Sequence, residues 1–216
     1  MVFITMSKFV STTFGQISGK HGSAVAAVNR DGTNVLRVYN RPTNPNTPKQ
    51  QEQRAKFGLV LRELGNFREV IKQGHKNPNA VNRVMSDMLK NGITGVMPDF
   101  KLDFSMLKLA AGPLPGVSDV VITPDAATTL VNMSWDTTIG VLGIAASEKD
   151  QLNIVVYNEL KKMCVLKSEV GERSIGTSSV DLPEGWLGDE VHIWAYMSRE
   201  DGSVNSDSTY IGLSQL

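Results

Sequence analysis

Residues 191–197 read Val-His-Ile-Trp-Ala-Tyr-Met, a stretch in which aliphatic side chains alternate with aromatic ones. An alternation with a period of two is typical of a β-strand, because successive side chains point to opposite faces of a sheet. The aliphatic side chains are expected to face a core, while Trp194 and Tyr196 are expected on the outer face. Neighbouring aromatic side chains on an outer face form an exposed patch that often marks a contact with a partner. We therefore predict that Trp194 and Tyr196 are interaction residues.

Six other segments in the C-terminal half have the same short, β-rich character. They are residues 117–123, 130–135, 152–157, 163–166, 174–180 and 209–211. About seven short strands within roughly 100 residues, separated by turn signals, indicate an antiparallel β-sandwich. In such a sandwich we expect Trp135 in the core, His192 on the surface, and Cys164 buried and chemically inert.

The N-terminal part contains a predicted β-hairpin. Two β-rich runs, residues 24–29 and 34–39, flank Arg30-Asp31-Gly32-Thr33, and Asp-Gly between such runs favours a hairpin turn. Residues 15–23 precede the hairpin and are rich in glycine, so we expect a turn or loop there. The spacing of these glycines does not fit a phosphate-binding loop, which needs four residues where this segment has three.

Three helices are predicted after a proline-containing connector at residues 41–46. The first helix has Thr47 as its N-cap and Pro48 in its first position. Its expected apolar face carries side chains at helical spacing, namely Phe57, Val60, Leu61 and Leu64. A second, shorter helix is expected over residues 66–74 and a third over residues 77–92, because start signals and a terminal glycine bound each of them.

The charges of the chain are unevenly distributed. The 216 residues include 22 basic and 22 acidic side chains, but residues 1–91 hold 14 Lys and Arg against 5 Asp and Glu. Residues 92–216 hold 8 basic against 17 acidic side chains. The run Ala-Ala-Gly-Pro-Leu-Pro-Gly at residues 110–116 is typical of a loop or linker. We therefore predict a basic domain over residues 1–110 and an acidic domain over residues 117–216.

Seven basic side chains of the N-terminal part are candidates for an electrostatic contact. They are Lys20, Arg30, Arg37 and Arg41 around the hairpin, and Lys49, Arg54 and Lys56 on the first helix. One interpretation is a solvated helix whose long basic side chains cover the edge of a core. The other is a contact of residues 1–91 with nucleic acid or an acidic partner, because local positive charge attracts phosphate and makes binding salt-dependent.

The composition excludes several kinds of chemical site. A single cysteine excludes an intramolecular disulfide and a multi-cysteine zinc site, and the three histidines lie far apart in the sequence. No motif of a metalloprotease, a nucleophile elbow or a dinucleotide site is present. We therefore expect no enzyme activity, no cofactor and no metal. The apolar stretches at residues 1–6 and 139–146 do not form an export signal or a membrane span, so we expect no membrane association and a cytoplasmic or virion location.

Two segments of the C-terminal half resemble a known kind of domain. Ser134-Trp135-Asp136 resembles the tryptophan-bearing second strand of a fibronectin type III or immunoglobulin-like domain, and residues 191–202 resemble its penultimate strand and turn. The resemblance implies an all-β immunoglobulin-like sandwich for the C-terminal half. Together with the hairpin and helices predicted for the N-terminal half, it gives an α+β fold class, with a small β/α-helical N-terminal domain followed by the sandwich. It implies little about function, because such sandwiches serve many roles.

A second resemblance covers the layout of the whole chain. Residues 44–57, Asn-Pro-Asn-Thr-Pro-Lys-Gln-Gln-Glu-Gln-Arg-Ala-Lys-Phe, together with residues 18–22, resemble a family of bacterial proteins of unknown function that is also found in phages and mobile elements. We predict a non-catalytic structural or protein-interaction protein, such as a virion or assembly component. Its opposite charges also favour self-association, basic surface to acidic surface. The alternative is a nucleic-acid-binding accessory protein that uses the basic N-terminal domain.

Overall fold

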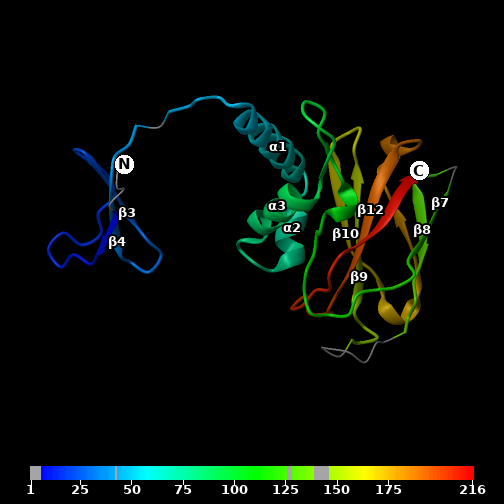
Figure 1. Ribbon diagram of the computed structural model, residues 1–216. Coiled ribbons are helices and arrows are strands. Elements are labelled where there is room, and N and C mark those ends of the chain that lie inside the picture. Colours follow the sequence, from blue (N-terminus) through cyan, green and yellow to red (C-terminus); the bar gives the residue numbers. More distant parts are fainter. Residues whose placement is uncertain (1–5, 42, 126–127, 139–145) are drawn as a thin grey trace. The chain divides into compact units, whose positions relative to one another are not determined.

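A computed structural model of the protein describes residues 6–41, 43–125, 128–138 and 146–216. The chain forms two compact units, Met1–Thr47 and Pro48–Leu216, which we call the N-terminal unit and the helix–sandwich unit (Figure 1). The apolar stretches at residues 1–6 and 139–146, for which we predicted neither an export signal nor a membrane span, consist largely of residues 1–5 and 139–145. These lie outside the described residues. The predicted boundary at residues 110–117 does not separate these two units.

The N-terminal unit is a small antiparallel sheet with the strand order β1-β4-β3-β2. Its strands are β1 (Met6–Phe9), β2 (Gly19–His21), β3 (Ala24–Val28) and β4 (Asn34–Val38). The predicted hairpin is confirmed as β3 and β4, whose turn has Gly32 at a φ of 80°. The expectation of a loop over residues 15–23 is wrong in part, because Gly19–His21 pairs with β3 as an edge strand.

Three helices open the helix–sandwich unit, as predicted. They are α1 (Pro48–Gly65), α2 (Arg68–His75) and α3 (Ala80–Asn91). The prediction that four apolar side chains of α1 face the core is correct for two of them. Val60 and Leu64 are buried, but Phe57 and Leu61 are 50% and 57% exposed. Only the side of α1 that carries Val60 and Leu64 packs against the rest of the unit.

The seven predicted strands of the C-terminal half are all present and form two sheets. Strands β7 (Val121–Pro124), β8 (Leu130–Ser134) and β11 (Thr177–Asp181) form a sheet with the order β11-β8-β7. Strands β9 (Gln151–Asn158), β10 (Met163–Glu172), β12 (Glu190–Ser198) and β13 (Thr209–Gln215) form a sheet with the order β10-β9-β12-β13. The described part of this unit also contains a short pair, β5 (Ile93–Thr94) with β6 (Lys101–Leu102), and the 3-10 turns η1 (Phe104–Met106), η2 (Arg173–Ile175) and η3 (Glu184–Trp186).

The two sheets enclose a hydrophobic cluster to which both contribute. Trp135 is 6% exposed in this cluster, which confirms its predicted place, and its indole N–H donates to the Arg173 carbonyl at 3.1 Å. The aliphatic residues of β12, including Val191 and Ile193, face the same cluster. The prediction that the aliphatic side chains of residues 191–197 face a core is therefore confirmed.

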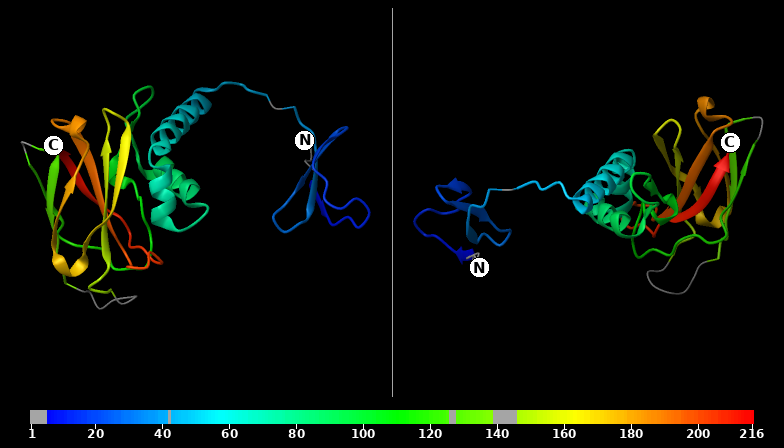
Figure 2. Two further views of the ribbon diagram at one scale, coloured as in Figure 1. Left: turned by 180° about the vertical axis from the view of Figure 1, so that it is seen from behind. Right: turned by 45° about the horizontal axis from the view of Figure 1, so that its top comes forward.

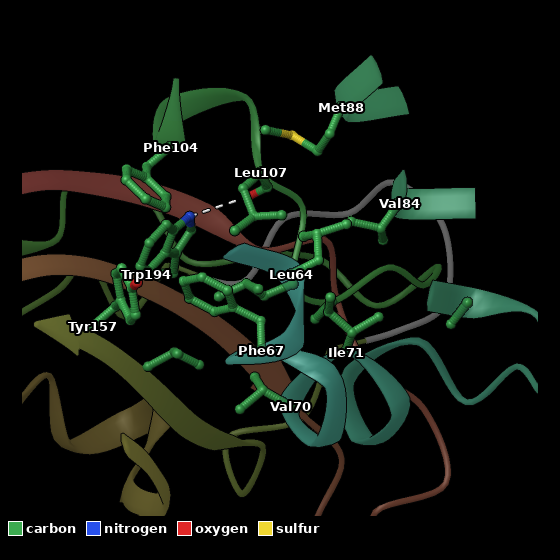
Figure 3. Packing of buried hydrophobic residues seen from close by; sticks show 14 of the residues in the cluster. Leu64, Phe67, Val70, Ile71, Val84, Met88, Phe104, Leu107, Tyr157 and Trp194 are labelled. Carbon is green, nitrogen blue, oxygen red and sulfur yellow. Dashed lines mark hydrogen bonds between the residues drawn. The ribbon is translucent and has the colours of Figure 1, made fainter. Parts of the chain in front are cut away.

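Trp194 and Tyr196, the aromatic residues expected on the outer face of β12, are buried as well, because the helices cover them. Trp194 is 0% and Tyr196 is 4% exposed, because the second face of the four-stranded sheet packs against α1, α2 and α3. Both views of Figure 2 show the helices standing against this side of the sandwich. Figure 3 shows Phe67 beside Trp194 and Tyr157, with ring centroids 5.7 and 4.5 Å away, and the Trp194 indole N–H donating to the Leu107 carbonyl at 3.1 Å. The prediction of an exposed aromatic patch is wrong, because the helices form a third layer over it.

The glycine- and proline-rich run at residues 110–116 is packed rather than a free linker. Arg173, which is 1% exposed, donates from its guanidinium to the carbonyls of Pro115 at 2.7 Å and Gly116 at 3.1 Å. On the helical side, the Asn205 amide donates to the carbonyl of Gly74 at 2.7 Å. These contacts tie the run and α2 to the sandwich, which explains why the helices and the sandwich are one unit.

Candidate interaction surfaces

The basic residues of the N-terminal sheet gather on one face. In an antiparallel sheet, directly opposite residues share a face, and Lys20, Val25 and Arg37 form one such row across β2, β3 and β4. In the neighbouring row on the same face, Lys8 of β1 stands opposite Val35. All three basic side chains are exposed.

An aromatic side chain extends this basic face. The ammonium of Lys20 lies 4.2 Å from the ring centroid of Tyr39, which places Tyr39 on the same side as Lys20. We call Lys8, Lys20, Arg37 and Tyr39 the cationic face. The described part of these four strands carries no acidic side chain, and the nearby Asp31 is held in the hairpin turn by the Thr33 hydroxyl at 2.6 Å. That hydrogen bond lowers the pKa of Asp31 below its ordinary value.

The opposite face of the sheet is occupied in part by the β1–β2 loop. Asn34, which is 1% exposed, donates from its side-chain amide to the Gly15 carbonyl at 2.9 Å and accepts from the Ile17 N–H at 3.0 Å. Ala26 is buried on this same face. A buried amide with two partners fixes the loop on this side, so that the loop leaves the cationic face open.

The other predicted contact residues fall into two groups. Arg30 in the hairpin turn and Arg41 after β4 are exposed in the N-terminal unit. Lys49 and Arg54 are exposed on α1, in the helix–sandwich unit. The set predicted from sequence is therefore divided between the two units.

Lys56 has a structural role within the helix–sandwich unit. Its ammonium lies 2.6 Å from a Glu52 carboxylate oxygen and 5.0 Å from the ring centroid of Phe100. Its side chain is only 24% exposed. This agrees with the interpretation in which basic side chains cover the edge of a core.

A polar cluster at the junction of α1 and the four-stranded sheet was not predicted from the sequence. Glu63 is 4% exposed and accepts from the Tyr157 hydroxyl at 3.1 Å and from the Lys162 ammonium at 3.2 Å. The Asn66 amide donates to the same Tyr157 oxygen at 3.2 Å. Burial, and then the neighbouring Glu63 carboxylate, raise the pKa of Tyr157 above its ordinary range. The hydroxyl therefore stays protonated and serves as a donor that holds the sheet to α1.

His192 lies beside this cluster, in a cavity of about 480 Å³ that Glu63 and Tyr210 also line. Its Nδ1 is 2.9 Å from the Tyr210 hydroxyl and its Nε2 is 3.7 Å from a Glu159 carboxylate oxygen. Burial lowers the pKa of His192, and Glu159 opposes that shift. Burial also raises the pKa of Tyr210. These contacts leave the His192 side chain only 12% exposed, so the predicted surface position of His192 is wrong.

Two further features bear on the chemistry of the described residues. Among them, no group of three or more His, Cys, Asp and Glu side chains is placed to hold a metal ion. Cys164 is half-buried beside the helical layer, and burial raises its pKa to about 12. The thiolate form that reacts and binds metals is therefore disfavoured, although Cys164 is half-buried rather than buried as predicted. In the described part of the chain, no helix has the length and apolar character needed to cross a bilayer.

These observations define a protein with a basic sheet module and a helix-covered β-sandwich. Residues 16–212 match the model described as Family of unknown function (DUF6266), and the chain belongs to this family. No curated protein and no solved structure matches the chain.

Proposed function

We propose that this protein is a non-catalytic interaction protein whose N-terminal unit contacts an acidic protein surface through the cationic face. The observation that carries the proposal is the exposure of Lys8, Lys20 and Arg37 on one face of one sheet. Positive charges held at fixed spacing on a sheet complement carboxylates on a partner and accelerate the encounter. The fixed loop on the opposite face leaves these charges accessible.

We extend the proposal to the sandwich, which we assign to the fibronectin type III-like class. In chain order, its first, second and fifth strands (β7, β8 and β11) form the three-stranded sheet. The other four (β9, β10, β12 and β13) form the second sheet. The tryptophan that follows the second strand, Trp135, is buried between the sheets. Sandwiches of this class commonly carry contact surfaces rather than reaction centres, and this supports a structural role for the helix–sandwich unit.

Binding of the full chain to immobilised poly-glutamate at low salt tests the cationic face. The triple variant Lys8→Glu, Lys20→Glu, Arg37→Glu is expected to bind at least about ten-fold more weakly, because three attractions become repulsions. The control is the triple variant Lys90→Glu, Lys108→Glu, Lys149→Glu, which makes the same charge change at exposed positions of the helix–sandwich unit. An equal loss in the control, or no loss in the first variant, contradicts the proposal.

A second candidate function, nucleic-acid binding, is favoured by the contact between Lys20 and Tyr39. An aromatic ring beside basic side chains on an open sheet is the kind of surface on which bases stack. Binding of the chain to single-stranded RNA and duplex DNA across a salt series separates the two functions. Three phosphate contacts predict a slope of log K against log salt of about −2 to −3. That slope, with no binding to poly-glutamate, assigns the cationic face to nucleic acid.

A narrower form of the proposal places the protein in a phage or mobile-element particle, with a cytoplasmic or virion location. Its support is the resemblance carried by residues 44–57. Co-sedimentation of the protein with purified particles is the expected result. Its presence only in the particle-free supernatant rejects this narrower form and leaves the interaction role standing.

A further inference from the structure

We infer that the partner of the cationic face is a second copy of this chain, and that it docks in an acidic cleft of the helix–sandwich unit. The inference rests on the proposed function and names its partner. The cleft has a volume of about 670 Å³ and is lined by Glu159, Leu160, Lys162, Gly188, Asp189, Glu190, His192 and Leu213. We call it the acidic cleft.

The acidic cleft lies where the helical layer stops covering the four-stranded sheet. Cys164, Tyr157, His192 and Leu213 form one row across β10, β9, β12 and β13, on the face that the helices cover further along. Tyr157 is 0% exposed in this row, whereas Leu213 is 52% exposed. Leu160, in the β9–β10 turn, is 80% exposed at the same cleft. Both exposed leucines therefore line this one cleft.

The charge of the acidic cleft selects a basic occupant. The side chain of Glu159 is 57% exposed and Glu190 is also exposed. No described residue forms an ion pair with Glu190. The cations of the cleft region are already engaged, because Lys161 pairs with Asp189 while Lys162 lies 3.2 Å from Glu63 and 3.8 Å from Glu159. Carboxylates beside exposed leucines complement a surface that is both basic and apolar.

The N-terminal unit has that combination of charge and apolar surface. It carries five basic side chains against the single acidic Asp31, which are Lys8, Lys20, Arg30, Arg37 and Arg41. Its exposed apolar side chains are Val10, Phe14, Val38 and Tyr39, at 74%, 77%, 50% and 39% exposure. The basic side chains of the cationic face complement Glu190. Tyr39 lies on that same face and complements Leu160 and Leu213, whereas Val38 lies on the opposite face beside Ala26.

The N-terminal unit also needs a partner surface for its own stability. Among its described residues only Ala26 and Asn34 are buried. A unit of this size with so small a core, and with no disulfide or metal in its described part, is near the lower limit for independent folding.

The test is the self-association of the full chain, measured by analytical ultracentrifugation over a range of concentrations at low and high salt. Association at low salt that weakens at high salt is expected, since exposed charges carry the attraction. Glu190→Lys is expected to weaken association roughly ten-fold, and Glu200→Lys, the same exposed charge change outside the cleft, is expected to leave it unchanged. Leu213→Ser is expected to weaken it too, against Ile175→Ser as the control at a residue 58% exposed.

A charge exchange makes the test specific. Arg37→Glu and Glu190→Lys chains are each expected to associate weakly, and their mixture is expected to associate again, because the reversed charges then meet. Failure of the mixture, or a strict monomer at every concentration, overturns the inference. Binding of poly-lysine to the acidic cleft without self-association also overturns it and assigns the cleft to a foreign basic partner. If self-association fails while the cationic face still binds poly-glutamate, the proposed function stands; loss of both rejects both.

Discussion

The N-terminal unit buries two described side chains, Ala26 and Asn34, whereas the helix–sandwich unit builds hydrophobic clusters on both faces of its four-stranded sheet. In the first unit a single polar residue, Asn34, holds the loop to the sheet. In the second unit the strands β9 and β12 are buried almost throughout. The difference shows that the buried core lies almost entirely in the helix–sandwich unit, whereas the N-terminal unit presents the cationic face with little core of its own. The predictions below challenge this division, beginning with the largest expected effect.

Trp194→Ala is expected to destabilise the helix–sandwich unit by about 3–5 kcal/mol, because it removes a fully buried indole from the contact between the helices and the sheet. Urea unfolding followed by far-UV circular dichroism and by tryptophan fluorescence measures the effect. Both signals are expected to shift together, since helices and sandwich share one core. Tyr39→Ala in the N-terminal unit is the control and is expected to leave the midpoint unchanged. A helical transition separate from that of the sandwich would show that the two layers fold independently.

Alkaline pH is expected to destabilise the helix–sandwich unit through its buried acids. Burial raises the pKa of Cys164 from 9.0 to about 12 and that of Tyr196 from 10.0 to about 12. The unfolded chain loses these protons first, so the free energy of unfolding falls as pH rises. The fall extends from about pH 9 to 12 for Cys164 and from about pH 10 to 12 for Tyr196, by at most about 1.4 kcal/mol per pH unit for each group. Urea midpoints across this range measure the fall. Cys164→Ala is expected to make it shallower, and an unchanged slope contradicts the assignment to Cys164.

Asn34→Ala is expected to destabilise the N-terminal sheet by about 1–3 kcal/mol, because the Gly15 carbonyl and the Ile17 N–H lose their buried partner. Amide hydrogen exchange is the measurement. Faster exchange is expected in β3 and β4, with no change in β9 or β12. Asn40→Ala, at an exposed amide after β4 in the same unit, is the control. If exchange also accelerates in β9, the two units are not independent in stability.

Arg37→Glu is expected to change the stability of either unit by less than about 0.5 kcal/mol, because its side chain is exposed. The same variant is expected to reduce poly-glutamate binding. This pair of results would place Arg37 in the contact surface and outside the folding core. Thermal unfolding beside the binding measurement tests both statements, and a loss of stability larger than the stated limit would contradict the surface role.

Local patterns in the sequence predicted most of the elements, because caps, turns and periodicity are local properties. Pro48 and Gly65 mark the bounds of α1, and Asp31-Gly32 marks the hairpin. The seven strands followed from their composition. What the sequence could not give is which elements pack together, since this depends on residues far apart in the chain.

Trp194 shows how that limit produced an error. Its alternation with Val191 and Ile193 correctly indicated a strand, but alternation alone does not say whether the second face meets water or a helix. One signal pointed to burial. Residues 154–157, Ile-Val-Val-Tyr, form a continuous apolar run, and this is typical of a strand covered on both faces. The error in the domain boundary has the same origin, because the helices were assigned to a separate domain.

The candidate surfaces were predicted in part. Lys20 and Arg37 were identified from local charge, but Lys8 was not, because it joins them only through the pairing of β1 with β4. The acidic cleft was missed, since Leu160, Glu190 and Leu213 come from three separate segments. Segments this far apart in the sequence leave no local pattern.

The hydrogen bond from Asn205 to the Gly74 carbonyl joins residues 131 positions apart. During synthesis on the ribosome, α2 leaves the exit tunnel long before the β12–β13 hairpin that carries Asn205. The apolar side of the helices therefore stays uncovered until the strands up to residue 205 have been translated, and during this time aggregation and chaperone capture compete with folding. A premature stop that removes the last two strands would leave the helical layer without its sheet, and such a nascent chain is a natural substrate for quality-control proteases.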